Sequence, residues 1–364
     1  MTHKQRIDSA LAYRTPDRTP CFEYVFSSRV PGALLGRPYH NYDVETDAAD
    51  WQAFVAEVGL EAALRRYAAD RVELAELLGH DLLYVVPNPG LAVERPYPAP
   101  QTYDEDDPVE TLEARNERWQ WALNEQPEDE SRFLVYQFLV EEMARRGVEL
   151  DLFAPCYCHG ASTDTTLLQA MLLDEDATRA HFALCTRQAL RFVEQYARYG
   201  VRHIGVGGDF SGNRPIISPE CYRKYIVPEV RKNVEAAHAV GAWAVNASDG
   251  DLWPVIDDFL IGCGVDAYME IDARAGMDLG RLKALYGDRV AFYGNVDCGE
   301  ALSYGTPESI RALTLRCLEE GAGNGGHIFT ASNAITDTIP VPNYLAMVNA
   351  YREAFGLPRV RPAQ

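Results

Sequence analysis

The sequence is short of basic residues and has no long hydrophobic run. Lys and Arg total 34 against 54 Asp and Glu, so the 364-residue chain has a formal net charge of −20 and a pI near 4.8. Binding to nucleic acids or to anionic membranes depends mainly on Lys and Arg, so neither is expected as a partner. No stretch of about 18 apolar residues is present, so no transmembrane helix is expected. An anionic small molecule is not excluded, because it responds to local charge only.

Cysteine is also too sparse for a disulfide framework. The chain has 8 Cys, most of them scattered singly, which is typical of a reducing cytoplasm. The segment Met1–Arg6 leads into a mixed helical pattern and lacks the apolar core of a signal peptide. We therefore expect a cytoplasmic location. Hydrophobic residues make up 47% of the chain and charged residues 24%, which excludes wholesale disorder.

Short apolar segments alternate with helical patterns along the chain. Eight such β-then-α units predict a (β/α)8 TIM-type barrel with an N-terminal extension, in a single domain over residues 1–364. A doubly wound open sheet is the alternative, less favoured because no G-x-G-x-x-G follows the first strand. A polar stretch rich in Pro and Glu, about 92–129, is expected to be a surface insertion. The predicted strands are 21–26, 81–86, 152–156, 203–207, 242–245, 267–270, 290–293 and 327–330.

Polar side chains gather where these strands end, which is where a barrel places its active site. Glu270 is the strongest candidate because it ends an apolar run, where a carboxylate without a partner would be costly. Carboxylates close together raise one another's pKa and so provide a general acid beside a general base. The predicted catalytic residues are Glu270, Asp249 and Asp209. The predicted substrate-binding residues are Glu23, Tyr24, Arg29, His159, Asn246, Asn295 and Asn333.

Other motifs point to little chemistry. A nucleophile elbow of the form G-x-S-x-G and a P-loop are both absent. The run Cys156-Tyr157-Cys158-His159 packs three metal-ligand types into four residues. It lacks the second pair that a structural zinc site needs, so buried packing is the favoured interpretation for the two cysteines.

Over nearly its whole length the chain resembles the uroporphyrinogen decarboxylase superfamily, which includes the decarboxylase of haem synthesis and the cobalamin- and corrinoid-linked methyltransferases. The match is clearest from about Gly200 onward. It implies a (β/α)8 barrel and an enzyme acting on a small molecule, and a homodimer, because dimers are common in the superfamily. The matching segments are Arg6–Leu11 with Pro16–Pro20, Gly208–Asp209 with Ser218–Pro228, and Tyr286–Asp297 with Gly305–Glu308.

The resemblance does not extend to the arginines of the decarboxylases. Those enzymes carry a paired-arginine motif after the first strand, where this chain has Arg29 alone. A porphyrinogen with many carboxylates needs several cationic partners, so decarboxylation of a porphyrinogen-like or other carboxylic acid is the alternative function. In that case Asp209 or Glu23 would stabilise a protonated pyrrole-like intermediate, and Arg29 or Arg214 would hold a carboxylate.

The methyltransferase branch implies zinc held by a His-x-Cys pair, a second Cys and a Glu. Here Ala247 and Asp249 stand at the first two positions, Asn333 lies near the third, and Glu270 matches the Glu. Oxygen ligands on Asp249, Glu270 and Asn333 would suit magnesium, calcium or manganese, and a metal-free site is equally open. The leading hypothesis is methyl transfer from a small methylated substrate to a corrinoid on a partner protein, or to a related acceptor. A non-catalytic small-molecule-binding barrel is the second alternative.

Overall fold

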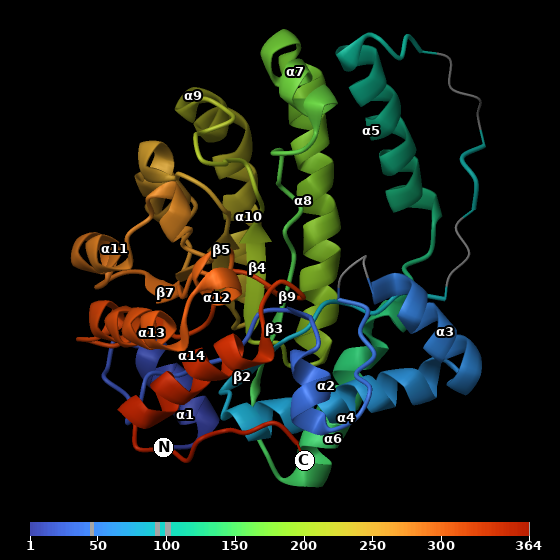
Figure 1. The fold of residues 1–364 in the computed structure, drawn as a ribbon. Helices are drawn as coiled ribbons and strands as arrows, with labels where there is room; N and C mark the ends of the chain where they lie inside the picture. The colour runs from blue at the N-terminus through green and yellow to red at the C-terminus, as the bar shows by residue number, and fades with distance from the viewer. Residues whose placement is uncertain (44–46, 92–94, 99–102, 364) are drawn as a thin grey trace.

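The computed structural model describes residues 1–43, 47–91, 95–98 and 103–363 (Figure 1). Parallel strands pair in the order β2-β3-β4-β5-β6-β7-β8, and helices pack around the outside of this sheet. Each of these strands lies in or overlaps a segment predicted from the sequence. The strands are β2 Leu82–Tyr84, β3 Asp151–Ala154, β4 His203–Gly207, β5 Trp243–Ala247, β6 Ala267–Met269, β7 Ala291–Tyr293 and β8 His327–Ile328.

A short segment before β2 closes the sheet into a barrel. The Phe22 N–H donates to the Phe329 carbonyl at 3.1 Å, and the Phe329 N–H donates to the Pro20 carbonyl at 2.8 Å. On the other side, the Asp81 N–H donates to the Cys21 carbonyl at 2.7 Å. Residues 20–22 therefore join β8 to β2 and complete a (β/α)8-type barrel, which confirms the predicted fold class.

The regular strand predicted over 21–26 is wrong. The Cys21 N–H is taken by the Asp81 carboxylate at 2.9 Å instead of by a neighbouring strand, so no continuous ladder forms there. The chain then pairs elsewhere: β1 (Phe26–Ser27) runs parallel to β9 (Ile335–Thr336) in a separate two-stranded sheet.

Helix limits follow the capping signals of the sequence. Ser218 accepts a hydrogen bond from the Cys221 N–H, and Thr306 with Ser309 forms a capping box. No helix of the described part of the chain is long and apolar enough to cross a bilayer. The helices are α1 His3–Leu11, α2 Val30–Leu35, α3 Ala48–Val58, α4 Leu60–Leu78, α5 Pro108–Glu125, η2 Glu130–Phe133, α6 Leu134–Arg146, α7 Thr165–Leu173, α8 Glu175–Arg198, α9 Pro219–Cys221, η3 Tyr222–Ile226, α10 Val227–Ala239, η4 Trp253–Val255, η5 Asp258–Gly262, η6 Ala273–Ala275, α11 Leu279–Tyr286, α12 Ala301–Tyr304, α13 Pro307–Gly321 and α14 Val341–Ala354.

The barrel interior is a packed aromatic and aliphatic core. The Phe153 ring lies 4.9 Å from that of Tyr84 and 6.2 Å from that of Tyr293. Helix α1 adds Ile7 and Leu11 to this interior cluster, so the N-terminal extension caps the barrel from the amino-terminal ends of the strands. A filled interior leaves the carboxyl ends of the strands as the place for a site.

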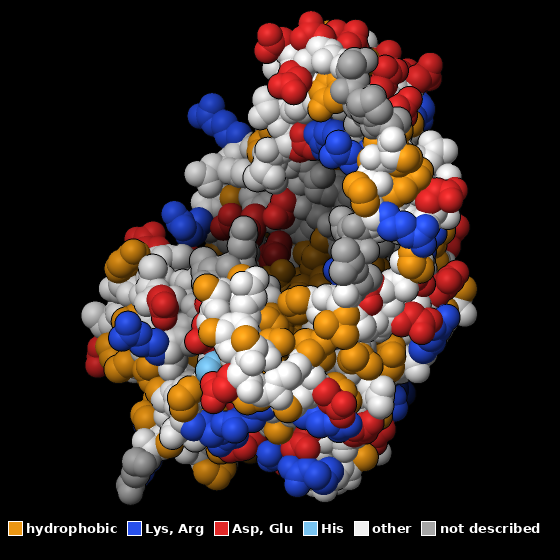
Figure 2. Space-filling view, turned by 90° about the vertical axis from the view of Figure 1, so that its right-hand side faces the viewer, with side chains coloured by type: hydrophobic (Ala, Val, Ile, Leu, Met, Phe, Trp, Pro, Cys, Tyr) orange, Lys and Arg blue, Asp and Glu red, His pale blue; other side chains and the backbone are white. Residues whose placement is uncertain are grey.

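The stretch predicted as a surface insertion contains helix α5, which packs beside α7 and α8 (Figure 1). Residues 92–94 and 99–102 of that stretch lie outside the described residues. Figure 2 views the molecule from the side of α5 and shows a deep hollow, with hydrophobic side chains on its floor and acidic side chains on one wall.

Candidate functional site

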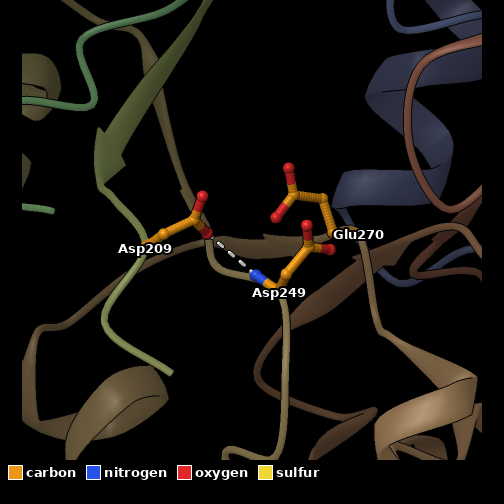
Figure 3. A group of neighbouring side chains, drawn as sticks. All are labelled: Asp209, Asp249 and Glu270. Atoms are coloured by element: carbon orange, nitrogen blue, oxygen red, sulfur yellow. Dashed lines mark hydrogen bonds between the residues drawn. The ribbon is translucent and has the colours of Figure 1, made fainter. Parts of the chain in front are cut away.

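Three carboxylates from neighbouring strands meet at the carboxyl end of the barrel (Figure 3). Asp209 follows β4, Asp249 follows β5, and Glu270 follows β6 directly. One carboxylate oxygen of each lies within 4.8 Å of the other two. Asp209 is exposed, Asp249 is half-buried and Glu270 is buried. The structure thus brings together the three residues that the sequence suggested as catalytic.

Two of these carboxylates are held in place by hydrogen bonds. The Asp249 N–H donates to Oδ1 of Asp209 at 3.0 Å (Figure 3). Nδ2 of Asn333 donates to Oδ2 of Asp249 at 3.0 Å. In contrast, Oε2 of Glu270 is buried and has no hydrogen-bond partner among the described residues. An unpaired buried oxygen is costly, so Glu270 is the member of the group most available to a ligand or a proton.

The backbone turns Glu270 into this group. Met269 belongs to the interior cluster, and in a continued strand the next side chain would point the opposite way, towards the helices. Instead Glu270 has φ +87° and Ile271 has φ +54°, a conformation that L-residues rarely adopt. Such strained residues cost of order 1–3 kcal/mol each and cluster at functional sites.

Burial and neighbouring charges raise the pKa values of Glu270 and Asp249. Burial, followed by the charges of Asp249, Asp209 and Asp272, raises the pKa of Glu270 well above its ordinary value. Burial, followed by Asp209 and Asp272, raises the pKa of Asp249 to about 6, against a smaller lowering effect of Asn333. Both shifts favour the protonated, neutral forms of these two carboxylic acids.

Tyrosine rings border the carboxylates. Tyr24 packs on Tyr84 with ring centroids 4.4 Å apart, and burial followed by the charge of Glu270 raises the Tyr24 pKa. Burial raises the pKa of Tyr157 too, with contributions from Tyr24 and Glu270, and its hydroxyl has no partner among the described residues.

Tyr157 was not among the predicted site residues. The signal was available, because Tyr157 continues the two-residue period of the interior-facing Phe153. Gly205 of β4 makes room for the ring: a Cβ there would lie 2.5 Å from Cζ of Tyr157.

Three of the predicted substrate-binding residues face the helices instead of the carboxylates. Asn246 is fully buried and donates to the Phe259 carbonyl, and it alternates with the interior-facing Val245 and Ala247. His159 is also fully buried, and its Nε2 lies 3.0 Å from Oγ1 of Thr186 on α8.

Asn295 is the third. Its Nδ2 donates to the Ile271 carbonyl at 3.1 Å, and its backbone N–H lies 3.3 Å from the Cys317 sulfur of α13. Asn246, His159 and Asn295 thus pack the helical layer against the sheet, although each follows or ends a strand in the sequence.

Glu23 and Arg29 are not members of this group of three carboxylates. Glu23 is buried, and its Oε1 accepts from the hydroxyl of Thr330 at 3.0 Å and the N–H of Ala331 at 3.3 Å. Burial raises the pKa of Glu23 to about 7. Arg29 is exposed at the start of α2.

Comparisons with known proteins place this barrel in a family. Residues 152–354 match the model of the family described as uroporphyrinogen decarboxylase (URO-D), and this span includes Asp209, Asp249 and Glu270. The chain belongs to the URO-D family. The curated proteins that the chain matches are named uroporphyrinogen decarboxylases, and the superfamily consists of enzymes.

Curated URO-D relatives are distant. The uroporphyrinogen decarboxylase of Geobacter metallireducens is 26% identical over 198 residues, which cover 52% of this chain and 53% of that protein. The corresponding enzyme of Chlorobaculum tepidum is 27% identical over 163 residues, covering 43% of this chain and 45% of that protein. The chain therefore spans about half the length of the curated relatives that it matches.

A solved methyltransferase shares the fold over its whole length. The methyltransferase from Methanosarcina mazei superposes with a TM-score of 0.64 and 16% identity, covering 98% of this chain and 99% of that one. At this identity the likeness concerns the barrel and its added helices, not the reaction.

The donor set of this URO-D member is made of oxygens. Asp209, Asp249 and Glu270 offer hard carboxylate ligands of the kind that Mg²⁺, Mn²⁺ and Ca²⁺ take, and a thiolate zinc site does not fit them. Asn333 is predicted as a third ligand, and its Oδ1 accepts a hydrogen bond from the Ala334 N–H at 2.7 Å. Asp209 joins Asp249 and Glu270 in the group of three carboxylates.

Proposed function

We propose that this URO-D family member is a methyltransferase that acts on a small methylated oxygen or nitrogen compound at the carboxylate group. The observation that carries the proposal is the buried Glu270 oxygen without a partner, beside Asp209 and Asp249. A protonated carboxyl there can stabilise the departing group of a methyl donor. A cluster of negative charge suits neutral or cationic donors and opposes the polyanionic substrate of a porphyrinogen decarboxylase.

Each residue has a distinct part in this reaction. Asp209 and Asp249 accept hydrogen bonds from the hydroxyl or ammonium groups of the substrate and fix its position. The rings of Tyr24 and Tyr157 cover its apolar side and exclude water. Glu270 holds its proton towards the departing atom, because its pKa is raised by burial and by its neighbours.

The donor in this reaction is a methyl ether or an alcohol such as methanol. The bond between the methyl carbon and the oxygen breaks, its electron pair stays on the oxygen, and the Glu270 proton moves to that oxygen. A reduced corrinoid carried by a partner protein would supply the electron pair that accepts the methyl group. For a protonated methylamine the nitrogen leaves as the neutral amine, and Glu270 remains a positioning acid.

A divalent cation fits the same residues. Asp209, Asp249 and Glu270 would hold Mg²⁺ or Mn²⁺, which would act as a Lewis acid on a substrate oxygen. Such an ion would displace the proton of Glu270, so metal binding and protonation would compete at this site, and pH would decide which of them prevails.

The test is methyl transfer to cob(I)alamin, with the purified protein and a panel of methyl ethers, methanol and methylamines. Deuterated methyl groups allow methylcobalamin to be quantified by mass spectrometry. We expect Glu270→Gln to lower turnover at least a hundredfold for oxygen donors, and Glu235→Gln, at an exposed site of α10, to leave it unchanged. Absence of transfer from every donor, with or without Mg²⁺, would reject the proposal.

Decarboxylation is the second candidate, favoured by the names of the curated relatives. It predicts loss of CO₂ from uroporphyrinogen supplied to the same preparation, and dependence on Asp209. Binding of donors without any turnover, unchanged in Glu270→Gln, would instead point to a non-catalytic barrel.

A further inference from the structure

A large cavity lies between α5, η2 and α8. Its volume is about 1300 Å³, and Asp209, Asp249 and Glu270 are not among its lining residues. Small-molecule sites usually have volumes of roughly 300–1,000 Å³, so there is room for a sizeable organic molecule.

The lining of this cavity is positively charged, whereas the chain as a whole is negatively charged. Arg118, Arg132 and Arg191 line it, and none of them forms an ion pair with a carboxylate in the part of the chain that the structure describes. Arg95 and Arg115 line it as well, and the acidic lining residues are Glu128 and Asp129. Arg115 is ion-paired with Asp164, which does not line the cavity. The other four arginines against two acids give 4 − 2, a local excess of two positive charges, where the whole chain carries −20.

The positive charge of the cavity does not come from its histidine, His181. His181 faces the same cavity, but burial lowers its pKa to about 4, so it is neutral near pH 7. Arginine remains charged at every relevant pH, so the cavity is cationic throughout that range.

Flat aromatic surfaces stand beside the arginines. Trp119 and Trp121 of α5 and Phe192 of α8 line the cavity, and Cζ of Arg132 lies 5.4 Å from the centre of the Phe192 ring. The Trp119 ring packs 5.6 Å from that of His181, which fixes its orientation. Guanidinium groups next to aromatic rings bind anionic groups and flat rings together.

We propose that this cavity binds an anionic aromatic molecule, with the arginines holding its acidic group and the tryptophans its ring. The site is independent of the carboxylate group and of the reaction proposed there. A bound anion would offset the positive charge of these arginines. Opposite charges at the two sites would keep such a ligand out of the carboxylate pocket.

The test compares two dyes of nearly the same shape. 8-Anilinonaphthalene-1-sulfonate carries an anionic group, and N-phenyl-1-naphthylamine lacks it; each is titrated by fluorescence with the full chain. We expect one sulfonate dye per chain, bound at least tenfold more tightly than the neutral dye. Its affinity should fall as NaCl is added, while that of the neutral dye should not.

Variants locate the binding site. Arg118→Gln/Arg132→Gln should weaken the sulfonate dye at least tenfold and leave the neutral dye unchanged, which also reports that the cavity is still folded. The control Arg145→Gln/Arg359→Gln removes the same charge from two residues that are 65% and 63% exposed. Equal affinity for the two dyes, or equal weakening in both double variants, would overturn the proposal.

Discussion

The backbone N–H of Asp249 donates to the carboxylate of Asp209 at 3.0 Å, across the ends of β4 and β5. This bond ties together two loops that must both carry negative charge, although the two carboxylates repel. The repulsion is visible in the raised pKa of Asp249, for which burial is the larger cause and Asp209 the next.

Asp249→Asn should therefore stabilise the protein at alkaline pH. The pKa of Asp249 is about 6 in the fold and about 4 when unfolded, so the folded state holds more protons and stability falls as pH rises from about 4 to 6. The variant lacks this loss. The difference in free energy of unfolding between variant and wild type should therefore be about 1–2 kcal/mol more favourable to the variant at pH 8 than at pH 4. Urea unfolding at the two pH values measures the difference, and parallel profiles would contradict it.

Mn²⁺ binding should become stronger as pH rises, whereas the stability of the wild type falls. Cation binding requires ionised carboxylates, so affinity should rise between pH 5 and pH 7.5 as Asp249 loses its proton. Calorimetric titration of wild type and of Glu270→Gln checks this, with at least tenfold weaker binding expected in the variant. Binding that is equal in both proteins would remove Glu270 from the ligand set.

Gly205→Ala should disturb the site through Tyr157. A Cβ at Gly205 would lie 2.5 Å from the Tyr157 ring, so the ring must move, at a cost of about 1–3 kcal/mol in the free energy of unfolding. Gly262→Ala is the matched control, because its Cβ would meet nothing closer than 3.5 Å. Thermal unfolding and the KM of the methyl donor should change in the first variant only.

His159→Phe tests the placement of His159 away from the substrate. It removes the hydrogen bond to Thr186, with an expected loss of about 1–2 kcal/mol in stability and no change in KM. Burial lowers the His159 pKa from 6.5 to about 4, so the stability it contributes is lost as pH falls between those values. The variant should be less sensitive to acid there. A raised KM with unchanged stability would return His159 to the substrate pocket.

The sequence was sufficient for the barrel and for its acidic residues. Apolar runs such as 203–207 identify strands because they are buried on both faces, and the carboxyl ends of parallel strands converge whatever the loops do. This convergence of strand ends predicts that Asp209, Asp249 and Glu270 lie together, as they do in the structure.

The sequence could not show which polar side chains turn towards the barrel interior. Asn246 and Glu270 both stand at or after strand ends, yet Asn246 follows the strand alternation outward while the positive φ of Glu270 reverses it. The closing segment was overestimated as a strand for a similar reason: the carboxylate of Asp81, 60 residues away, takes the Cys21 N–H. Long-range side-chain contacts of this kind leave no periodic signal in the sequence.

The protonation of Glu270 at neutral pH is the most direct test of the proposed site. An infrared difference spectrum between wild type and Glu270→Gln at pH 7 measures it without any substrate. We predict the carbonyl band of a protonated carboxylic acid in wild type that is missing from the variant. A difference spectrum with only carboxylate bands would show Glu270 ionised and would contradict its role as the acid.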